Sequence, residues 1–309
     1  ITLDLQGGDL SAFSWVVDNK IIYTSASGTF KLPKPVKTDY DFVGWIYGEN
    51  PPVKEVEISA AENRTYVASW TLAFLTFTLP GDITLEMRHC PAGSFVRGGI
   101  KGDGNTVTIS KDFYMGTYEV TNAQYAAIMG SSPSVDAGSE FAGANQPVVY
   151  IKWDVIMSEP SGFIAQINSQ LADQLPIGYK FALPTEAQWE YACRAGTETD
   201  LNSNKDIEND WANDPNTNEV AWNWPNWGTF NNRTHDIGGL ASNSFGLYDI
   251  HGNVWEWCAD WYSDYDGSNL TDPTGPAEFD PSWGSGRRVL RGGSWQDYPC
   301  YCTSWCRDG

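Results

Sequence analysis

The part of the chain after Gly196 constrains the fold most, because it contains no run of residues with helical periodicity. Residues 197–309 are rich in Asn, Asp, Gly, Pro and Trp, and only short strands are predicted there, at Asn253–Ala259 and Arg288–Leu290. The chain as a whole has 15 Trp, 15 Tyr and 13 Phe beside 30 Gly and 17 Pro. Large rings fill volume where regular elements are scarce. The sequence therefore predicts a loop-rich globular domain.

Two helices are predicted ahead of that segment. Each begins with a capping box, in which a Thr side chain caps the helix and a Gln three residues later reaches back, at Thr121–Gln124 and Thr185–Gln188. Apolar residues at helical spacing follow each box, and Gly130 and Gly196 are placed to end the two helices. Helices and short strands in one segment predict an α+β fold.

A separate small domain is predicted at residues 1–72. Short alternating runs are separated there by Gly, Asp-Asn and Pro turns, which is typical of β-strands. Tyr40–Trp45 and Thr65–Trp70 resemble the strand signatures of the Listeria–Bacteroides surface repeat, with Asp39 and Ser69 departing from its pattern. The resemblance implies a spacer or display module. The alternative is a small mainly-β domain of no particular family.

Charge excludes several classes of partner. Lys and Arg number 19 against 39 Asp and Glu, a formal net charge of −20, so nucleic acid and anionic lipid surfaces are repelled. No apolar run reaches the ~18–20 residues of a membrane helix. The chain begins without Met and shows no signal peptide, so we expect a processed form. The acidic surface and the polar loops favour an extracellular protein.

Four motifs in the second domain carry a family resemblance. They are residues 118–125, 183–196, 245–258 and 288–295, the last reading Arg-Val-Leu-Arg-Gly-Gly-Ser-Trp. Together they resemble the formylglycine-generating-enzyme (sulfatase-modifying factor) family, a branch of the C-type lectin-like fold. The resemblance implies that residues 73–309 form an α+β domain with two helices, a small antiparallel sheet and long loops. It leaves function open, because one fold hosts several activities.

Copper-dependent members of this family carry cysteines three and eight residues after the Ser of the Arg-Gly-Gly-Ser motif. Here those positions are Asp297 and Cys302, so one of the two thiolates that suit Cu(I) is missing. Cys300 is a poor substitute, because residues two apart in a strand point to opposite faces. Three His residues also count against the iron-dependent branch. A copper-dependent oxidase is therefore kept as the alternative function, and no catalytic residue or catalytic cofactor is predicted.

The tail after the Arg-Gly-Gly-Ser-Trp motif indicates a different function. The arrangement resembles the variable proteins of bacterial diversity-generating retroelements, treponemal surface lipoproteins among them, in which mutagenised codons of one type randomise this stretch. That codon type excludes only Trp305 among residues 297–309. The resemblance implies a non-catalytic binder with a variable segment at about 288–309. A fixed structural tail with disulfides, or a purely structural adhesin segment, is the alternative.

Ligand contacts are expected from polar and aromatic tail side chains presented by a rigid scaffold. The predicted contacts are Asp297, Tyr298, Cys300, Tyr301, Cys306 and Asp308. Trp295 and Trp305 are expected to belong to the scaffold. The expected partner is an unidentified protein or other surface ligand, at the bacterial cell surface, with membrane attachment only through a lipid anchor that this chain does not include.

Calcium-binding members of the family imply a structural Ca²⁺ site in residues 249–256. The matching groups are the carboxylates of Asp249 and Glu256 and the carbonyls of Gly252 and Val254, a donor set that suits a hard cation. A capped or salt-bridged turn without metal is the alternative. The acidic loop of the family's other calcium site is replaced by Thr234–Gly238.

Two expectations concern Cys and His. The resemblance implies a disulfide from Cys193 to Cys302 or Cys306, which would anchor the tail. His235 and His251 are interpreted as ordinary loop histidines. The family also continues beyond the position of Gly309, so we expect further chain there.

Overall fold

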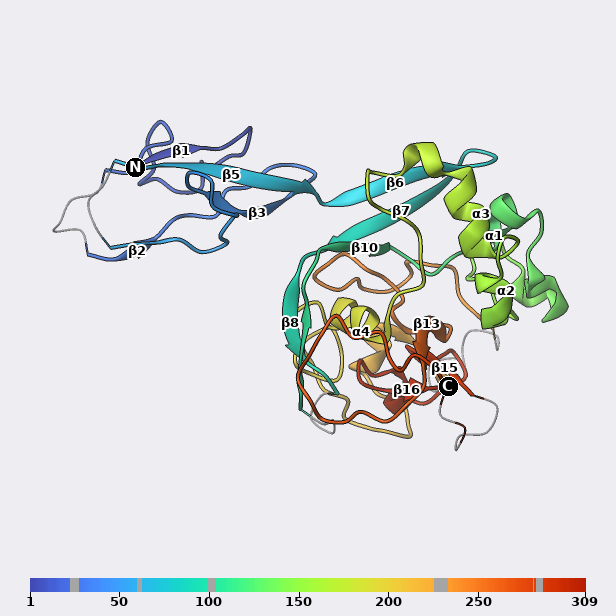
Figure 1. The fold of residues 1–309 in the computed structure, drawn as a ribbon. Coiled ribbons are helices and arrows are strands. Elements are labelled where there is room, and N and C mark those ends of the chain that lie inside the picture. The colour runs from blue at the N-terminus through green and yellow to red at the C-terminus, as the bar shows by residue number, and fades with distance from the viewer. Residues whose placement is uncertain (23–27, 60–62, 99–103, 225–232, 280, 282–285) are drawn as a thin grey trace. The chain divides into compact units, whose positions relative to one another are not determined.

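The computed structural model has the expected α+β character, with few helices and several small sheets (Figure 1). It describes residues 1–22, 28–59, 63–98, 104–224, 233–279, 281 and 286–309. The chain divides into two compact units, Ile1–Leu75 and Thr76–Gly309, and the boundary expected at 72/73 lies just before this division. None of the helices in the described ranges combines the length and apolar character that a membrane crossing needs.

The unit Ile1–Leu75 is built on a three-stranded sheet with the order β1-β5-β3, in which β1 is parallel and β3 antiparallel to β5. Its strands are β1 (Thr2–Asp4), β2 (Phe30–Lys31), β3 (Tyr40–Ile46), β4 (Glu57–Ile58) and β5 (Thr65–Leu72). Trp45 of β3 and Tyr66 of β5 lie in its apolar core. The likeness of this unit to a surface repeat stays a prediction.

The unit Thr76–Gly309 contains four small sheets in its described residues, with the orders β10-β7-β6, β14-β9-β8, β13-β15-β16 and β11-β12. The strands are β6 (Phe74–Leu79), β7 (Ile83–Cys90), β8 (Gly93–Val96), β9 (Thr106–Ile109), β10 (Phe113–Gly116), β11 (Ala221–Trp222), β12 (His251–Gly252), β13 (Glu256–Trp261), β14 (Leu270–Thr271), β15 (Arg288–Arg291) and β16 (Arg307–Asp308). Long loops join these short strands, as the composition predicts.

The two predicted helices are confirmed, and two further ones were missed. The helices are α1 (Asn122–Met129), α2 (Trp153–Met157), α3 (Phe163–Gln170) and α4 (Glu186–Arg194). Short 3-10 helices lie at Pro133–Asp136, Ser139–Phe141, Ala172–Gln174, Thr217–Glu219 and Pro299–Cys302. Both capping boxes form, at the starts of α1 and α4. The starts of α2 and α3 carry no side-chain cap, so the signal that revealed the other two helices is absent there.

Helix α4 organises the core of the second unit. It packs against β13 and β15 (Figure 1). Trp189 and Cys193 on one face of α4 are fully buried with Leu247, Ile250 and Val289. This packing places the acidic side chains of α4 beside the strand that leads into the C-terminal tail.

Replacing Thr185 with Ala is expected to lower the free energy of unfolding by about 1 kcal/mol, the usual effect of losing an N-cap. The Thr185 hydroxyl accepts a hydrogen bond from the Gln188 main-chain N–H at 3.1 Å, and the Gln188 side-chain oxygen accepts one from the Thr185 main-chain N–H at 3.0 Å. Thr185→Ser keeps the acceptor and is the matched control. Denaturant unfolding of both variants measures the difference, and equal losses would contradict a capping role.

Candidate functional site

A buried network of charges joins β15 to α4. The guanidinium of Arg291 is completely buried and forms ion pairs with Glu190 and, at 3.3 Å, with Glu186. Glu190 also pairs with Arg194 at 2.9 Å, and Arg307 of the tail pairs with Glu186 at 2.7 Å. Buried charges are tolerated only when they are paired in this way. Two of the arginines thereby hold β15 and β16 against the same helix.

The Arg291 side chain also holds the tail directly, by bonding to main-chain atoms of the tail. One guanidinium nitrogen donates hydrogen bonds to the carbonyl oxygens of Ser304, at 3.1 Å, and of Cys306. A carbonyl acceptor is present whatever side chain its residue carries. These two contacts are therefore insensitive to the residue types at the two positions.

Other bonds between the scaffold and the tail share this property, since the tail contributes only main-chain atoms. They are Trp224 N to Asp297 O (2.7 Å), Cys300 N to Asp210 O (3.4 Å), His251 Nδ1 to Cys302 O (2.6 Å) and Ser304 N to Asp200 O (2.8 Å). Strand β16 adds backbone pairing of Arg307 and Asp308 with β15. These main-chain contacts do not depend on the tail's side chains, and they set its path together with the side-chain contacts of Trp305 and Arg307.

Gly293 lets the tail approach the Arg-Gly-Gly-Ser motif closely. Its φ of +75° lies in the left-handed region that glycine adopts without strain. A Cβ atom at this position would lie 2.8 Å from the Cys302 Sγ and 2.8 Å from the Tyr301 carbonyl oxygen. The motif therefore forms a platform on which the short 3-10 helix Pro299–Cys302 rests.

The tail side chains divide into buried and outward-facing sets. Cys302, Thr303 and Ser304 are fully buried. Tyr301 and Asp308 are exposed, whereas Asp297, Tyr298, Cys300 and Cys306 are partly buried. The first set can only be part of the scaffold, and the six predicted contacts all lie in the second set. Their role in binding a ligand stays a prediction.

Two of the six predicted contacts are less available than the sequence suggests. The Asp297 carboxylate accepts hydrogen bonds from Trp255 Nε1 at 2.9 Å and from the Ser294 hydroxyl at 2.5 Å. Burial raises the pKa of the Cys306 thiol to about 12.

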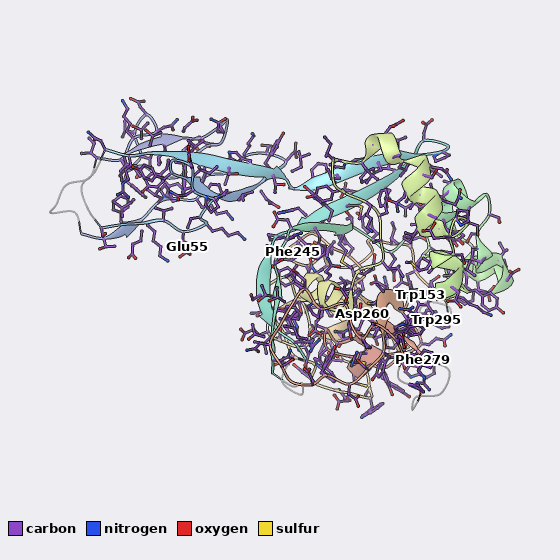
Figure 2. All side chains as sticks on the ribbon, in the orientation of Figure 1. Glu55, Trp153, Phe245, Asp260, Phe279 and Trp295 are labelled. Carbon is purple, nitrogen blue, oxygen red and sulfur yellow. The ribbon has the colours of Figure 1, made fainter. Side chains whose placement is uncertain are left out.

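Trp305, interpreted as scaffold, donates from Nε1 to Asp200 at 2.6 Å. Trp295, labelled in Figure 2, tilts against Phe141 with ring centroids 5.9 Å apart.

Sequence reasoning missed two tryptophans beside the tail. Trp211 and Trp224 are 61% and 40% exposed. The Trp211 ring lies 5.6 Å from the Tyr298 ring and 6.1 Å from the Tyr301 ring, and Trp224 lies 6.1 Å from Tyr298. We call these four residues the aromatic cluster. Two belong to the tail and two to the long loop after α4, where no periodic pattern signals their position.

The two positions that the family resemblance assigns to copper ligands, Asp297 and Cys302, both contact Ser294. Its hydroxyl donates to Asp297, and its carbonyl oxygen lies 4.0 Å from the Cys302 sulfur. Burial raises the pKa of the Cys302 thiol well above its usual range. The argument against Cys300 as a substitute assumed a strand, which is wrong, since Pro299 begins a 3-10 helix here. Cys302 nevertheless is buried while Cys300 faces partly outward.

The expected disulfide from Cys193 is wrong in this structure, where Cys193, Cys302 and Cys306 are thiols. The His251 ring lies between the candidate partners: its Nε2 is 3.6 Å from the Cys193 sulfur, and its Nδ1 donates to the Cys302 carbonyl oxygen. Nε2 accepts from the Asn202 main-chain N–H at 3.1 Å, so the ring is neutral with its proton on Nδ1.

The interpretation of His251 as an ordinary loop histidine is therefore wrong. His251 lies in β12, completely buried, and burial lowers its pKa to about 4. His235 does lie outside the regular elements, but its ring stacks on Trp222 with centroids 3.8 Å apart. Both histidines pack within the domain that presents the tail.

A thiol titration tests the absence of a bridge. Protein unfolded without reductant is expected to yield all six cysteines as thiols with Ellman's reagent. In the native state at pH 8, Cys193, Cys302 and Cys306 should react slowly, because burial raises the pKa of each thiol. A reduced sample provides the control count. Four or fewer thiols before reduction would contradict the structure.

The predicted cation site brings together three carboxylates whose pKa values are raised, those of Asp249, Glu256 and Glu119. Burial is the main cause for each: the pKa of Asp249 is raised to about 6, that of Glu256 to about 7, and that of Glu119 well above its usual range. One Asp249 oxygen accepts from the Gly238 N–H at 2.5 Å, while the other is buried without a hydrogen-bond partner. Such an orphaned oxygen fits a cation ligand.

The rest of this region is tied together by hydrogen bonds. The Glu119 carboxylate accepts from Asn253 Nδ2 at 2.7 Å and from the Val254 N–H at 3.0 Å. Within the described ranges, no three His, Cys, Asp or Glu side chains could hold a metal ion by themselves. A cation here would therefore need main-chain carbonyls, such as those predicted at Gly252 and Val254.

Comparison with known proteins is consistent with this geometry. The structure resembles Treponema denticola variable protein 1, with a TM-score of 0.62 and 29% identity over 77% of this chain and 93% of that one. In sequence, the chain is 27% identical to the formylglycine-generating enzyme of Bos taurus, over 70% of this chain and 67% of the enzyme. It is 29% identical to chaperone protein LppX of Paenibacillus barcinonensis, over 61% and 71% of the two chains.

The family is established by a match over most of the chain. Residues 80–308 match the sulfatase-modifying factor enzyme 1-like domain, and the match includes all four motifs and nearly the whole tail. The resemblance inferred from those motifs is thereby confirmed, together with the C-type lectin-like fold. The chain therefore belongs to the sulfatase-modifying factor enzyme 1-like family.

Proposed function

We propose that this chain is a non-catalytic ligand-binding protein whose C-terminal tail is diversified by a retroelement and displayed on a C-type lectin-like scaffold. The observation that carries the proposal is the way the tail is held. Arg291, His251, Asp200 and Trp224 all bond to its main-chain atoms. A tail anchored in this way can change its outward side chains while its backbone path is preserved.

The likeness to a Treponema variable protein supports this function over catalysis. The Asp at position 297 supports it as well, because an oxygen ligand suits Cu(I) poorly. We place the protein at the bacterial cell surface, with an unidentified protein or other surface ligand as its partner and a lipid anchor outside this chain. The N-terminal unit then serves as a spacer.

A pair of libraries tests the display of the tail. One randomises the outward positions Tyr298, Tyr301 and Asp308, and the other randomises the buried positions Cys302, Thr303 and Ser304. We expect most members of the first library to stay resistant to proteolysis and most of the second to lose resistance, because overpacked or polar substitutions are tolerated poorly in a core. Equal survival of the two libraries would contradict the proposal.

Enzyme activity is tested separately by copper binding. Titration with Cu(I) against a chelator is expected to find no tight one-to-one site in the native chain. Tight binding that Cys302→Ala abolishes would contradict the non-catalytic function and favour the copper-dependent oxidase. This alternative is tested because the relatives include a formylglycine-generating enzyme.

We further propose that Ca²⁺ binds as a structural ion beside Asp249 and Glu256, with the carbonyls of Gly252 and Val254. Two observations support this site: the orphaned Asp249 oxygen, and the negative charges of Asp249 and Glu256, which add to burial in raising the pKa of Glu119. Saturating Ca²⁺ should raise Tm, because a ligand at one hundred times its Kd adds about 2.7 kcal/mol to the free energy of unfolding. Glu256→Gln should remove the response, with Mg²⁺ as the control ion. A Tm unchanged by Ca²⁺ and by chelation would contradict the site.

A further inference from the structure

The aromatic cluster lies in strongly acidic surroundings. The loop segment 195–224, which presents Trp211 and Trp224, carries one basic residue, Lys205, which pairs with Glu219 at 2.6 Å. It carries seven carboxylates: Glu198, Asp200, Asp206, Glu208, Asp210, Asp214 and Glu219. The one arginine of the tail, Arg307, is paired with Glu186. The basic residues of the loop and the tail are thus already engaged within the protein.

The negative field reaches the rings themselves. The pKa of the Tyr301 hydroxyl is raised, first by burial and then by Cys300, Cys306, Asp297 and Asp308, of which the two aspartates carry a negative charge at neutral pH. An anionic ligand would meet the same repulsion at the cluster. A neutral ligand would gain nothing from the carboxylates. A cationic group gains from both the charges and the rings.

The loop holds Trp211 in a defined position. Asp214 is completely buried, and its carboxylate accepts hydrogen bonds from the N–H groups of Glu208 (2.7 Å), Asn209 (3.0 Å) and Thr217 (2.7 Å). Asn209 in turn accepts from the Trp211 N–H at 3.1 Å. An ordered loop loses little conformational freedom when a ligand binds. The exposed indole is therefore preorganised as a contact.

Partly buried arginines already lie against aromatic rings elsewhere in the protein. The Arg288 guanidinium lies 3.7 Å from the ring centroid of Trp153, labelled in Figure 2, and 3.4 Å from that of Trp261. Arg307 lies 4.0 Å from the Tyr265 ring. Indole is the best ring for such contacts, and its face attracts a guanidinium or an ammonium group. Trp211 and Trp224 offer the same chemistry at the surface.

We propose that the aromatic cluster binds a basic peptide segment of a protein partner, with an Arg or Lys side chain against Trp211 and Trp224. The inference rests on the proposed function, whose ligand class it specifies. Carboxylates spread over the loop and the tail match several cations spaced along a peptide. A zwitterionic lipid headgroup fits less well, because its phosphate would be repelled by the same carboxylates.

Binding of a labelled peptide of repeated Arg-Gly-Ser units to the full chain tests this proposal. A peptide with neutral citrulline in place of arginine is the matched probe. We expect binding of the first alone, weakened by raising the salt from about 0.05 M to about 1 M, where the screening length falls to about 3 Å. Trp211→Ala should weaken binding about tenfold, and Trp211→Phe less, because phenylalanine keeps an aromatic face.

Trp15→Ala is the matched control variant, since Trp15 is 48% exposed in the other unit. It should bind the arginine peptide as the native chain does. Equal binding of the citrulline peptide, equal binding by Trp211→Ala, or binding of phosphatidylcholine vesicles but not of the peptide would each overturn the proposal. The proposed function survives these outcomes, because it is tested by the two tail libraries, the Cu(I) titration and the sequencing of the tail, none of which uses the peptide.

Discussion

Replacing Arg291 with methionine is expected to lower the free energy of unfolding of the unit Thr76–Gly309 by about 3–5 kcal/mol, as breaking a buried ion pair does. The change leaves the buried Glu190 carboxylate without one of its two cations. It also removes the donors to the carbonyls of Ser304 and Cys306. Methionine fills a similar volume, so the loss reports the charge and the hydrogen bonds rather than a cavity.

The control for this variant is Arg287→Met. Arg287 is exposed and lies one residue before β15, so its replacement should change stability by less than about 0.5 kcal/mol. Guanidinium unfolding followed by near-UV circular dichroism measures both variants. Limited proteolysis should show faster cleavage within the tail of the Arg291 variant. A loss below about 1 kcal/mol for Arg291→Met would contradict the anchoring role.

Gly293→Ala is expected to have the second largest effect. A left-handed conformation is unfavourable for alanine by about 1–2 kcal/mol, and forcing a methyl group into a packed site adds about 1–3 kcal/mol. The added Cβ would lie 2.8 Å from Cys302 Sγ and the Tyr301 carbonyl oxygen, so the tail must shift. Stability and reactivity of Cys302 should change together, and denaturant unfolding with thiol labelling measures both.

Gly267→Ala separates the two contributions. Gly267 has a φ of +71°, close to that of Gly293, but nothing lies within 4 Å of the position of its Cβ. Its replacement should show the backbone strain alone. If the two alanine variants lose the same stability, the tail does not rest on Gly293, and the platform formed by the motif is refuted.

The sequence predicted the two helices whose starts are marked by residues close together in the chain. The capping boxes at Thr121 and Thr185 gave the starts of α1 and α4 correctly, because cap and partner are three residues apart. The N-cap residues of α2 and α3, Lys152 and Gly162, supply no side-chain cap, and these helices form because the surrounding fold packs them. Their starts carried no comparable local signal.

Contacts between residues far apart in the sequence could not be predicted from local patterns. Arg291 and Glu190 are 101 positions apart, and nothing in either motif indicates that their charges meet. The Trp224 main-chain N–H bonds to the Asp297 carbonyl oxygen, and residue types do not indicate such a bond because every residue has a carbonyl oxygen. The disulfide from Cys193 was expected by family resemblance alone, and the His251 ring in that space could not be foreseen.

The division of the tail has a consequence for how its sequence can vary. Cys302, Thr303 and Ser304 are fully buried and follow directly on Tyr301, which is exposed. Variation that preserves the fold must therefore favour the positions before and after this buried stretch. Within the variable segment expected at about 288–309, the proposed variation is therefore expected at a smaller set of outward positions.

Sequencing the 3′ end of the gene from many cells or isolates tests the central claim most directly. The account predicts substitutions concentrated at Asp297, Tyr298, Cys300, Tyr301 and Asp308, with Arg288–Trp295 unchanged and the buried Pro299 and Cys302–Ser304 rarely altered. They should fall at first and second codon positions, as mutagenised codons of the retroelement type require. An invariant tail, or substitutions spread evenly over residues 288–309, would contradict diversification of a displayed binding surface.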